Sequence, residues 1–353
     1  MVQQDQFEEL RDSIAELVHT GLIEQARTRL LELHPADQAD IFEDLDREVI
    51  APLFDALNTD QKAELLEYLQ DELRGELAGE LTASELAPVL DQLDEDVAAD
   101  IVQDLEPEQQ QAVVSLLEER EDITEILSYP EQSAAGRMST EFVALHRRWT
   151  VDEAIAFLRA EVTDADQTFY LYVVDEDEHL IGVVGLRNLI TASPDTPVAA
   201  IMSENFRSVG ALEDQEVAAE RMRHYNLLAL PVVDEQNCLI GVITADDVLD
   251  VQVEEATEDM LRMAGVGVQE RAFSPVLESA RRRIPWLTFN MAWAFAGAFI
   301  IGIFNGTLDK LPALAIFMPM IAGQAGNAGI QTATIVVRAI SLDEVHPNDM
   351  FAL

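Results

Sequence analysis

Residues 172–184 read YVVDEDEHLIGVV, and residues 231–243 read PVVDEQNCLIGVI. The two stretches are offset by 59 residues, and each consists of two short apolar runs separated by an acidic turn. Short apolar runs bounded by turn residues predict buried β-strands. Each copy is preceded by a helical segment and, before that, by a Met-Ser pair, at positions 138–139 and 202–203. The sequence therefore predicts two copies of one small α/β unit.

The order and spacing of this repeat resemble a tandem pair of CBS domains, α/β modules that bind adenine nucleotides or dimerise. We expect the two domains to cover residues 135–200 and 201–256. The resemblance implies a hydroxyl and an aspartate at the strand-to-helix junction for ribose and phosphate, but in the first copy Gly185 stands at the hydroxyl position. Nucleotide binding therefore stays open, with Tyr170 as base stacker and Arg187 as phosphate partner. The candidate nucleotide-binding residues are Tyr170, Arg187, Asn188 and Thr244.

Residues 1–128 show a helical pattern and no strand pattern. Leucines recur at spacings of three and four residues with acids between them, as in amphipathic helices; examples are Leu66, Leu69, Leu73, Leu77 and Leu81. Residues 39–45, ADIFEDL, return as residues 99–105, ADIVQDL. Short helices that repeat and bury their apolar faces on their neighbours form a superhelical stack. We therefore predict an all-α repeat domain over residues 1–128.

The end of the chain has a different composition from the rest. The whole chain has 67 acidic and 22 basic residues, whereas residues 281–340 have one acidic and five basic residues. Residues 284–305 form an uncharged stretch of 22 residues, long enough to cross about 30 Å of hydrocarbon as a helix. A second uncharged stretch follows, and we predict spans at about 284–305 and 311–340. The basic residues at 281–283 and Arg338 place both outer ends on the cytoplasmic side.

The sequence thus predicts a multidomain fold: an all-α superhelical repeat domain, an α/β CBS-domain pair and an α-helical transmembrane segment. Two long buried helices in a soluble protein are the alternative to the spans. A formal charge of −45 excludes nucleic acid as a partner, because affinity for nucleic acid comes from cationic side chains. The histidines are scattered, and the sequence contains no Gly-rich phosphate loop or nucleophile elbow, so we predict no enzyme activity.

Seven carboxylates and no basic residue lie between positions 246 and 259: Asp246, Asp247, Asp250, Glu254, Glu255, Glu258 and Asp259. In a helix, several of these fall on one face and repel one another. Oxygen ligands select hard cations such as Mg²⁺. A solvated acidic face explains the pattern equally well. A second pair, Asp96 and Asp100, is spaced i, i+4 in the helical region. Two such acidic surfaces facing each other would separate unless divalent cations bridged them.

The second predicted span contains a polar run. Polar residues at membrane depth are costly and lie at helix interfaces or along a pathway. We predict that five small or polar residues of this run line a pore, with a glycine-rich packing seam as the alternative. These residues are Gly326, Asn327, Gly329, Gln331 and Thr332.

These features together resemble the MgtE family of magnesium channels over essentially the whole chain. The most specific parts are residues 326–334, GNAGIQTAT, and the acidic run at 245–259. The resemblance implies a multi-pass homodimer in the inner cell membrane, joined through its CBS and transmembrane domains, in contact with lipid and with its N-terminal and CBS domains in the cytoplasm. It also implies that cytosolic Mg²⁺ binds between these domains and holds the pore closed, and it leaves ATP open as a modulator.

The resemblance also assigns roles to particular segments. Asp247, Asp250, Glu255, Glu258 and Asp259 would be sensor ligands, with Asp96 and Asp100 facing them. A connecting helix at 257–280 would plug or release the pore. The family has five spans per subunit, and one of the later spans carries an aspartate for the permeating ion. We therefore expect the chain to be truncated, with three spans missing.

The sequence therefore predicts Mg²⁺ transport gated by Mg²⁺ bound between the acidic N-terminal and CBS domains. One alternative is a membrane-anchored CBS regulator that senses adenine nucleotides without transport, but a simple anchor has no need for the polar run. Another is transport of cobalt, nickel or manganese. The acidic cluster lacks histidine and cysteine, which disfavours soft and borderline metals.

Overall fold

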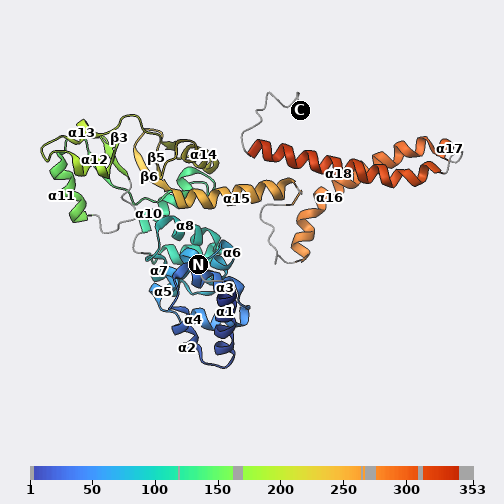
Figure 1. Cartoon of the computed structure of the whole chain (residues 1–353), viewed down its shortest axis with the longest axis horizontal. Helices are drawn as coiled ribbons and strands as arrows, with labels where there is room; N and C mark the ends of the chain where they lie inside the picture. Colours follow the sequence, from blue (N-terminus) through green and yellow to red (C-terminus); the bar gives the residue numbers. More distant parts are fainter. Residues whose placement is uncertain are drawn as a thin grey trace. The chain divides into compact units, whose positions relative to one another are not determined.

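The computed structural model describes residues 4–117, 120–161, 170–263, 265–266, 276–308 and 313–341. The chain forms two units, Met1–Val248 and Leu249–Leu353. The first unit contains a helical domain and two small sheets, and the second contains long helices (Figure 1). The predicted fold class, an all-α domain followed by a CBS pair and an apolar helix, is confirmed.

The helical domain is a stack of short helices. Their bounds are α1 Gln4–His19, α2 Ile23–Leu30, α3 Pro35–Asp44, α4 Arg47–Asp55, α5 Thr59–Tyr68, α6 Asp71–Glu80, α7 Ala83–Leu90, α8 Glu95–Asp104, α9 Pro107–Val114 and α10 Arg120–Leu127. Helices two apart in the sequence pack together: α3 on α5, α5 on α7 and α7 on α9, and likewise α6 on α8 and α8 on α10. Each helix therefore buries its apolar face on neighbours in the stack, as expected for a repeat domain.

The regular leucine spacing is interrupted by helix ends. Leu69 and Leu81 are both buried, but each has extended backbone and ends its helix, α5 and α6 respectively. The next starts are fixed by side chains: Asn58 and Thr82 form capping boxes at the N-termini of α5 and α7. Capping of this kind satisfies backbone N–H groups that have no partner inside the helix. The apolar pattern thus continues through the turns, and the caps set the helix lengths.

The CBS pair consists of two three-stranded sheets with the same topology. Its elements are η1 Ala134–Arg137, β1 Ala144–His146, α11 Val151–Glu161, β2 Tyr170–Val174, β3 Leu180–Gly185, α12 Leu186–Thr191, α13 Val198–Ile201, β4 Val209–Gly210, α14 Gln215–Tyr225, β5 Ala229–Val233 and β6 Leu239–Thr244. In each sheet the first strand runs parallel to the central strand and the third runs antiparallel to it. The repeated sequence therefore folds into a repeated structure.

The two copies agree in strand register. Tyr172 pairs with Val183 in the first sheet, and Pro231 pairs with Val242 at the equivalent place in the second. The register of both hairpins also shifts at the same point, after Val173 and after Val232.

The Met-Ser pairs explain the glycine in each LIGV run. Ser139 bridges to Val242 of the second copy, and Ser203 bridges to Val183 of the first. A Cβ atom at Gly241 would lie 2.9 Å from the carbonyl oxygen of Ser139 and 2.4 Å from the Sδ atom of Met138, so a larger residue would force the backbone of the Met-Ser pair to shift. The start of each copy therefore packs on the last strand of the other, which joins the two domains into one body.

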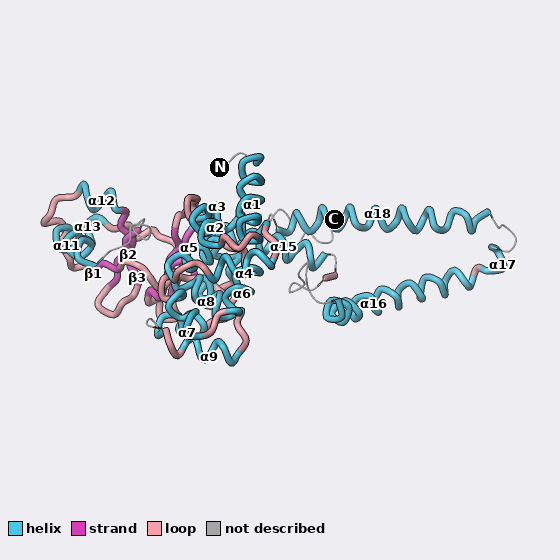
Figure 2. Tube along the Cα trace, turned by 90° about the horizontal axis from the view of Figure 1, so that it is seen from below, coloured by secondary structure: helices cyan, strands magenta, loops and turns pink. Residues whose placement is uncertain are grey.

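The second unit begins within α15 (Ala245–Met263), whose first residues belong to the first unit. It continues with α16 Val276–Ile303, α17 Asn305–Leu308 and α18 Ala313–Ser341, of which α16 and α18 are long (Figure 2). Within the described residues, one helical segment is long and apolar enough to cross a membrane, Ser279–Ile303. This segment includes residues 284–303 of the first predicted span, whereas α18, which covers most of the second predicted span, is not a further such segment among the described residues.

Candidate cation-sensing site

The first turns of α8 carry the carboxylates that face the CBS pair. Asp94 precedes the helix, Glu95 and Asp96 lie in its first turn, and Asp100 follows one turn later. Acidic residues are stabilised in the first turn because the exposed backbone N–H groups there carry partial positive charge. The local sequence therefore favours a helix start at which several negative charges lie close together.

Glu95 is bound by neutral donors from the CBS pair. Its side chain is 6% exposed, and its Oε2 atom accepts hydrogen bonds from Ser139 Oγ at 3.1 Å and from the backbone N–H of Thr140 at 3.2 Å. Burial raises the pKa of Glu95, and these hydrogen bonds act in the opposite direction. The CBS pair thus supplies donors for this buried carboxylate.

Asp100 is bound by an arginine of the CBS pair. Arg137 Nη1 donates to Asp100 Oδ2 at 2.8 Å, and Arg137 Nε donates to Gln215 Oε1 at 3.0 Å. The side chains of Arg137 and Asp100 are 15% and 22% exposed. This is a partly buried, charge-assisted hydrogen bond, which is stronger than a hydrogen bond between neutral groups.

Asp247 lies in the first turn of α15, where it reaches back to the preceding strand. Its Oδ2 atom accepts hydrogen bonds from Thr244 N at 2.8 Å and from Thr244 Oγ1 at 2.6 Å. A carboxylate that bonds back to the residue before the helix fixes the helix start. Thr244 and Asp247 thus hold each other in place.

Asp96 faces Asp247. The Oδ1 atom of Asp96 is buried and has no hydrogen-bond partner among the described residues. Burial, followed by the charge of Asp247, raises the pKa of Asp96 well above its ordinary value. Burial also raises the pKa of Asp247, whereas its bonds to Thr244 and a side-chain hydrogen bond with Asp96 oppose that rise. Two carboxylates in one buried place cannot both be ionised without a cost.

The donor set at this contact fits a hard divalent cation. A cation between Asp96 and Asp247 would neutralise both carboxylates and give the Asp96 Oδ1 atom a partner. Oxygen ligands suit Mg²⁺, which binds through one or two carboxylates and keeps several waters. These two residues would hold the ion, and the ion would supply the positive charge that the contact lacks.

The other predicted sensor residues lie on α15, which crosses the boundary between the two units. Asp246 is exposed beside Asp247, and its charge adds to the rise in the Asp247 pKa. The remaining members lie on α15 in the second unit: Asp250, Glu254, Glu255, Glu258 and Asp259. Glu258 is buried and forms an ion pair with Arg262, one turn further along the helix. The structure therefore brings together three of the predicted ligands, Asp96, Asp100 and Asp247.

Two residues of the contact were missed by sequence reasoning, Glu95 and Arg137. Glu95 stands next to Asp96, and its acidic neighbours were the available signal. Arg137 lies 37 residues from Asp100, just before the first Met-Ser pair. Only the packing of that segment against α8 shows that the two side chains meet.

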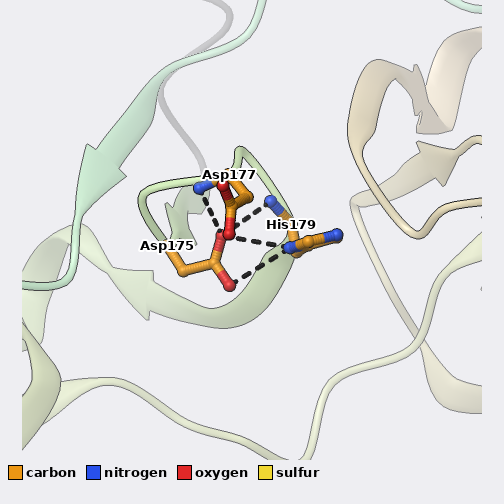
Figure 3. A group of neighbouring side chains, drawn as sticks. All are labelled: Asp175, Asp177 and His179. Atoms are coloured by element: carbon orange, nitrogen blue, oxygen red, sulfur yellow. Dashed lines mark hydrogen bonds and ion pairs between the residues drawn. The ribbon is translucent and has the colours of Figure 1, made fainter.

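A second group of possible ligands occurs in the acidic turn of the first CBS copy. Ligand atoms of Asp175, Asp177 and His179 lie within 4.8 Å of one another (Figure 3). Asp175 Oδ1 accepts hydrogen bonds from the backbone N–H groups of Asp177 and His179, at 2.9 and 3.1 Å. In the second copy, Asp234 accepts equivalent backbone bonds from Gln236 and Cys238. Since both copies build the same turn with different side chains, the turn itself accounts for this group.

A cavity of about 220 Å³ lies between the two CBS copies. It is lined by Tyr170, Tyr172, Val183, Asn205, Phe206, Arg207, Tyr225, Leu227, Ala229 and Pro231. Arg207 lies over the Tyr225 ring, with its guanidinium carbon 4.6 Å from the ring centre. Of the four predicted nucleotide-binding residues, Tyr170 lines this cavity, whereas Thr244 is bound to Asp247. Arg207 is therefore the cation placed to meet an anionic ligand in the cavity.

Comparison with known proteins places these features in a family. Residues 33–132 match the MgtE intracellular N domain, and residues 134–195 and 198–254 match the CBS domain. The chain is 31% identical over 355 residues to the magnesium transporter MgtE of Bacillus subtilis, and the match covers 100% of this chain and 79% of that protein. The chain belongs to the MgtE family. It is also 35% identical to the magnesium transporter MgtE of Thermus thermophilus, with 97% of this chain and 78% of that protein covered.

A solved MgtE structure matches the first part of the chain. The cytosolic domain of the Mg²⁺ channel MgtE, in complex with ATP, is similar with a TM-score of 0.63 and 36% sequence identity. The match covers 68% of this chain and 99% of that one. The helical stack and the CBS pair are therefore similar in fold to the cytosolic domain of that channel.

The predicted pore residues of this MgtE chain all lie on α18. Gly326, Asn327, Gly329, Gln331 and Thr332 are exposed within the second unit. A Cβ atom at Gly326 or Gly329 would meet no atom within 4 Å among the described residues. Thr332 Oγ1 donates to the Ala328 carbonyl at 2.9 Å, which satisfies its hydroxyl within the helix. The assignment of this helix to a pore stays a prediction.

Proposed function

We propose that this MgtE chain transports Mg²⁺ across the cell membrane and is regulated by Mg²⁺ bound between its helical and CBS domains. The observation that carries the regulatory part is the partly buried Asp96–Asp247 pair, in which the Asp96 Oδ1 atom is buried and has no hydrogen-bond partner among the described residues. A contact that partly buries two facing carboxylates is unfavourable while both are ionised and no cation lies between them. Mg²⁺ therefore favours the docked state of the two domains.

The transport part rests on similarity that continues beyond the CBS pair. The match to the Bacillus subtilis transporter covers the whole chain, including α16 and α18. This extent supports a transporter over the alternative of an anchored nucleotide sensor. A multi-pass chain with its helical and CBS domains in the cytoplasm and its polar α18 residues along the ion path is part of the proposal.

Transport can be tested with the purified full chain in liposomes that contain a magnesium-sensitive dye. We expect Mg²⁺ influx that empty liposomes do not show. The same assay with cobalt, nickel and manganese ranks the ions. Liposomes with the protein that admit no more Mg²⁺ than empty ones would contradict the transport proposal.

Regulation can be tested by limited proteolysis of the full chain across a millimolar Mg²⁺ titration, with sodium at matched ionic strength as control. We expect wild-type protection that follows Mg²⁺ and that sodium does not reproduce, whereas protection of the Asp247→Ala variant should no longer depend on Mg²⁺. Wild-type protection that ignores Mg²⁺ would contradict the sensor. The Asp46→Ala variant is a matched control. Asp46 is also an aspartate at the start of a helix, since it precedes α4, but it lies within the helical stack.

A second candidate function is ATP binding in the cavity between the CBS copies. Tyr170 and Arg207 line the cavity and offer a stacking surface and a cation, and the related cytosolic domain is in complex with ATP. Isothermal titration with ATP should show binding that the Arg207→Gln variant weakens. Equal affinity in that variant would remove Arg207 from the site.

The remaining assignments follow from family membership. We propose a homodimer joined through the CBS and transmembrane domains, with exposed apolar side chains such as Ile190 and Leu212 available for contacts. The wider sensor set on α15 and the plug role of residues 257–280 belong to the same proposal. That segment overlaps the ends of α15 and α16, and residues 264 and 267–275 lie outside the described part.

A further inference from the structure

We infer that Arg137 is a permanent internal cation of the magnesium sensor, which takes the place of a bound ion at Asp100 and positions α8 so that Asp96 faces Asp247. This inference rests on the proposed regulatory function. It changes the role expected for Asp100, which would be a partner of Arg137 and would bind no ion in the docked state.

Arg137 is held rigidly by the CBS pair. The backbone N–H groups of Ala134 and Ala135 donate to carbonyls of the second copy, those of Glu213 and Ala211, at 2.7 and 3.0 Å. A Cβ atom at Gly136 would lie 2.4 Å from the carbonyl oxygen of Pro130, so this segment is tightly packed. Gln215, which is 2% exposed, accepts the hydrogen bond from Arg137 Nε. The guanidinium therefore reaches α8 in a fixed orientation.

Arg137 supplies the positive charge that one ion would otherwise bring. Its guanidinium cannot lose its proton under physiological conditions, so its charge is independent of pH and of ion concentration. The 2.8 Å bond to Asp100 is partly buried, where water screens it less than at the surface. A divalent cation added at Asp100 would be repelled by this fixed charge.

The position of Asp100 links this bond to the ion site. Asp100 and Asp96 are one helical turn apart on α8, and residues at i and i+4 lie on the same face. When Arg137 holds Asp100, the preceding turn is therefore held against Asp247. The bond between Arg137 and Asp100 can therefore form at any ion concentration. The ion is needed only between Asp96 and Asp247.

The backbone N–H of Thr140 gives a direct readout of docking, since it donates to Glu95 across the contact. Hydrogen–deuterium exchange of a peptide containing Thr140 can be followed in the full chain during a Mg²⁺ titration at constant ionic strength. The midpoint of the titration is the Mg²⁺ concentration at which half of the molecules are docked. The slope of the logarithm of the docked-to-undocked ratio against the logarithm of Mg²⁺ concentration gives the number of ions taken up.

Three variants separate an internal cation from an ordinary ligand pair. Arg137→Gln should raise the midpoint about threefold, because a charge-assisted hydrogen bond is lost, and should raise the slope by about one ion, because Asp100 then binds Mg²⁺. Asp100→Asn should raise the midpoint and leave the slope unchanged. Arg137→Lys keeps the charge and should keep the wild-type slope. Arg148→Gln breaks an exposed arginine–carboxylate pair within the first CBS copy, away from the segment that holds Arg137, and should change neither value.

Opposite results would overturn the inference. A lower slope in Asp100→Asn would show that Asp100 binds Mg²⁺ in the wild type, and an unchanged slope in Arg137→Gln would show that Arg137 replaces no ion. Circular dichroism checks the fold of each variant. If Arg137→Gln does not fold, the nearly isosteric Asp100→Asn still decides the question through its slope. Failure of the wild-type chain to respond to Mg²⁺ would instead remove the proposed sensor itself.

Discussion

Helix α8 meets the CBS pair at two places that differ in how their charges are balanced. At the start of the first CBS copy, Glu95 receives donors from Ser139 and Thr140, and Asp100 receives Arg137. At the start of α15, Asp96 faces another carboxylate, that of Asp247. At the first place, protein donors alone balance the carboxylates, whereas at the second place no positive charge balances Asp96 and Asp247.

This difference suggests how a switch can respond to millimolar ions. Hydrogen bonds at the first place bring the domains together, and repulsion at the second place opposes them. A ligand shifts such an equilibrium only by the difference between its affinities for the two states. An ion that binds between Asp96 and Asp247 has a higher affinity for the docked state than for the undocked state. It directly removes the repulsion between these two carboxylates, which opposes docking.

The largest effect is expected from Asp96→Asn, which removes the difference between the two places. The asparagine amide can donate to Asp247, so repulsion is replaced by a charge-assisted hydrogen bond. We expect the domains to dock without Mg²⁺, with the docking equilibrium shifted about tenfold or more. Limited proteolysis across the Mg²⁺ titration measures this shift as protection that is already present at zero Mg²⁺.

A matched control is Asp37→Asn, since Asp37 lies in the first turn of α3, within the helical stack. It should leave the Mg²⁺ titration unchanged. If Asp96→Asn needed as much Mg²⁺ as the wild type, repulsion between Asp96 and Asp247 would not be what the ion relieves.

A smaller effect is expected from pH in the absence of Mg²⁺. Burial raises the pKa of Asp96, Asp247 and Glu95, so the docked state binds protons that the undocked state releases. Docking is therefore strongest below the ordinary carboxyl pKa and is lost as pH rises through the raised pKa values. The charges of Asp94, Asp100 and Asp246 add to the rise. Arg137 keeps its charge throughout.

Exchange at the Thr140 N–H in magnesium-free buffer measures this dependence. We expect the protection factor of this N–H, corrected for the pH dependence of intrinsic amide exchange, to increase a few-fold as pH falls from neutrality toward the ordinary carboxyl pKa. Asp96→Asn should flatten the profile. Protection that increased with pH would reverse the sign and contradict the burial of these carboxylates in the docked state.

The fold was largely predictable because its patterns are local. Alternating apolar runs and turn residues, repeated at a fixed offset, were enough to predict both CBS copies, which agree even in their register shift after Val173 and Val232. The leucine spacing predicted helices but not their ends. Leu69 and Leu81 continue the apolar pattern while leaving helical geometry, so hydrophobicity alone gives no signal of the break.

The site was predictable where charge alone identified it. The acidic run that includes Asp247 stands out by charge, whereas the pair Asp96 and Asp100 gains meaning only beside that run. All three residues lie where α8 contacts the CBS pair. Their partners did not stand out, because Arg137 and Ser139 reach α8 only after the domains pack. Arg207 did not stand out for the same reason, since its place in the cavity lining depends on how the chain packs between the two CBS copies.

The smallest effect is expected from Asp246→Asn, which tests whether the ion site is confined to Asp96 and Asp247. Asp246 is exposed, and its charge acts on Asp247 from the solvent side, where salt screens it. We expect the Mg²⁺ midpoint of docking to change by less than about twofold, and only at low ionic strength. Titrations of the variant at low and high salt measure this. A change of tenfold or more that persisted at high salt would show that Asp246 binds the ion itself. The ion site would then extend beyond Asp96 and Asp247 to the solvent-facing side of α15.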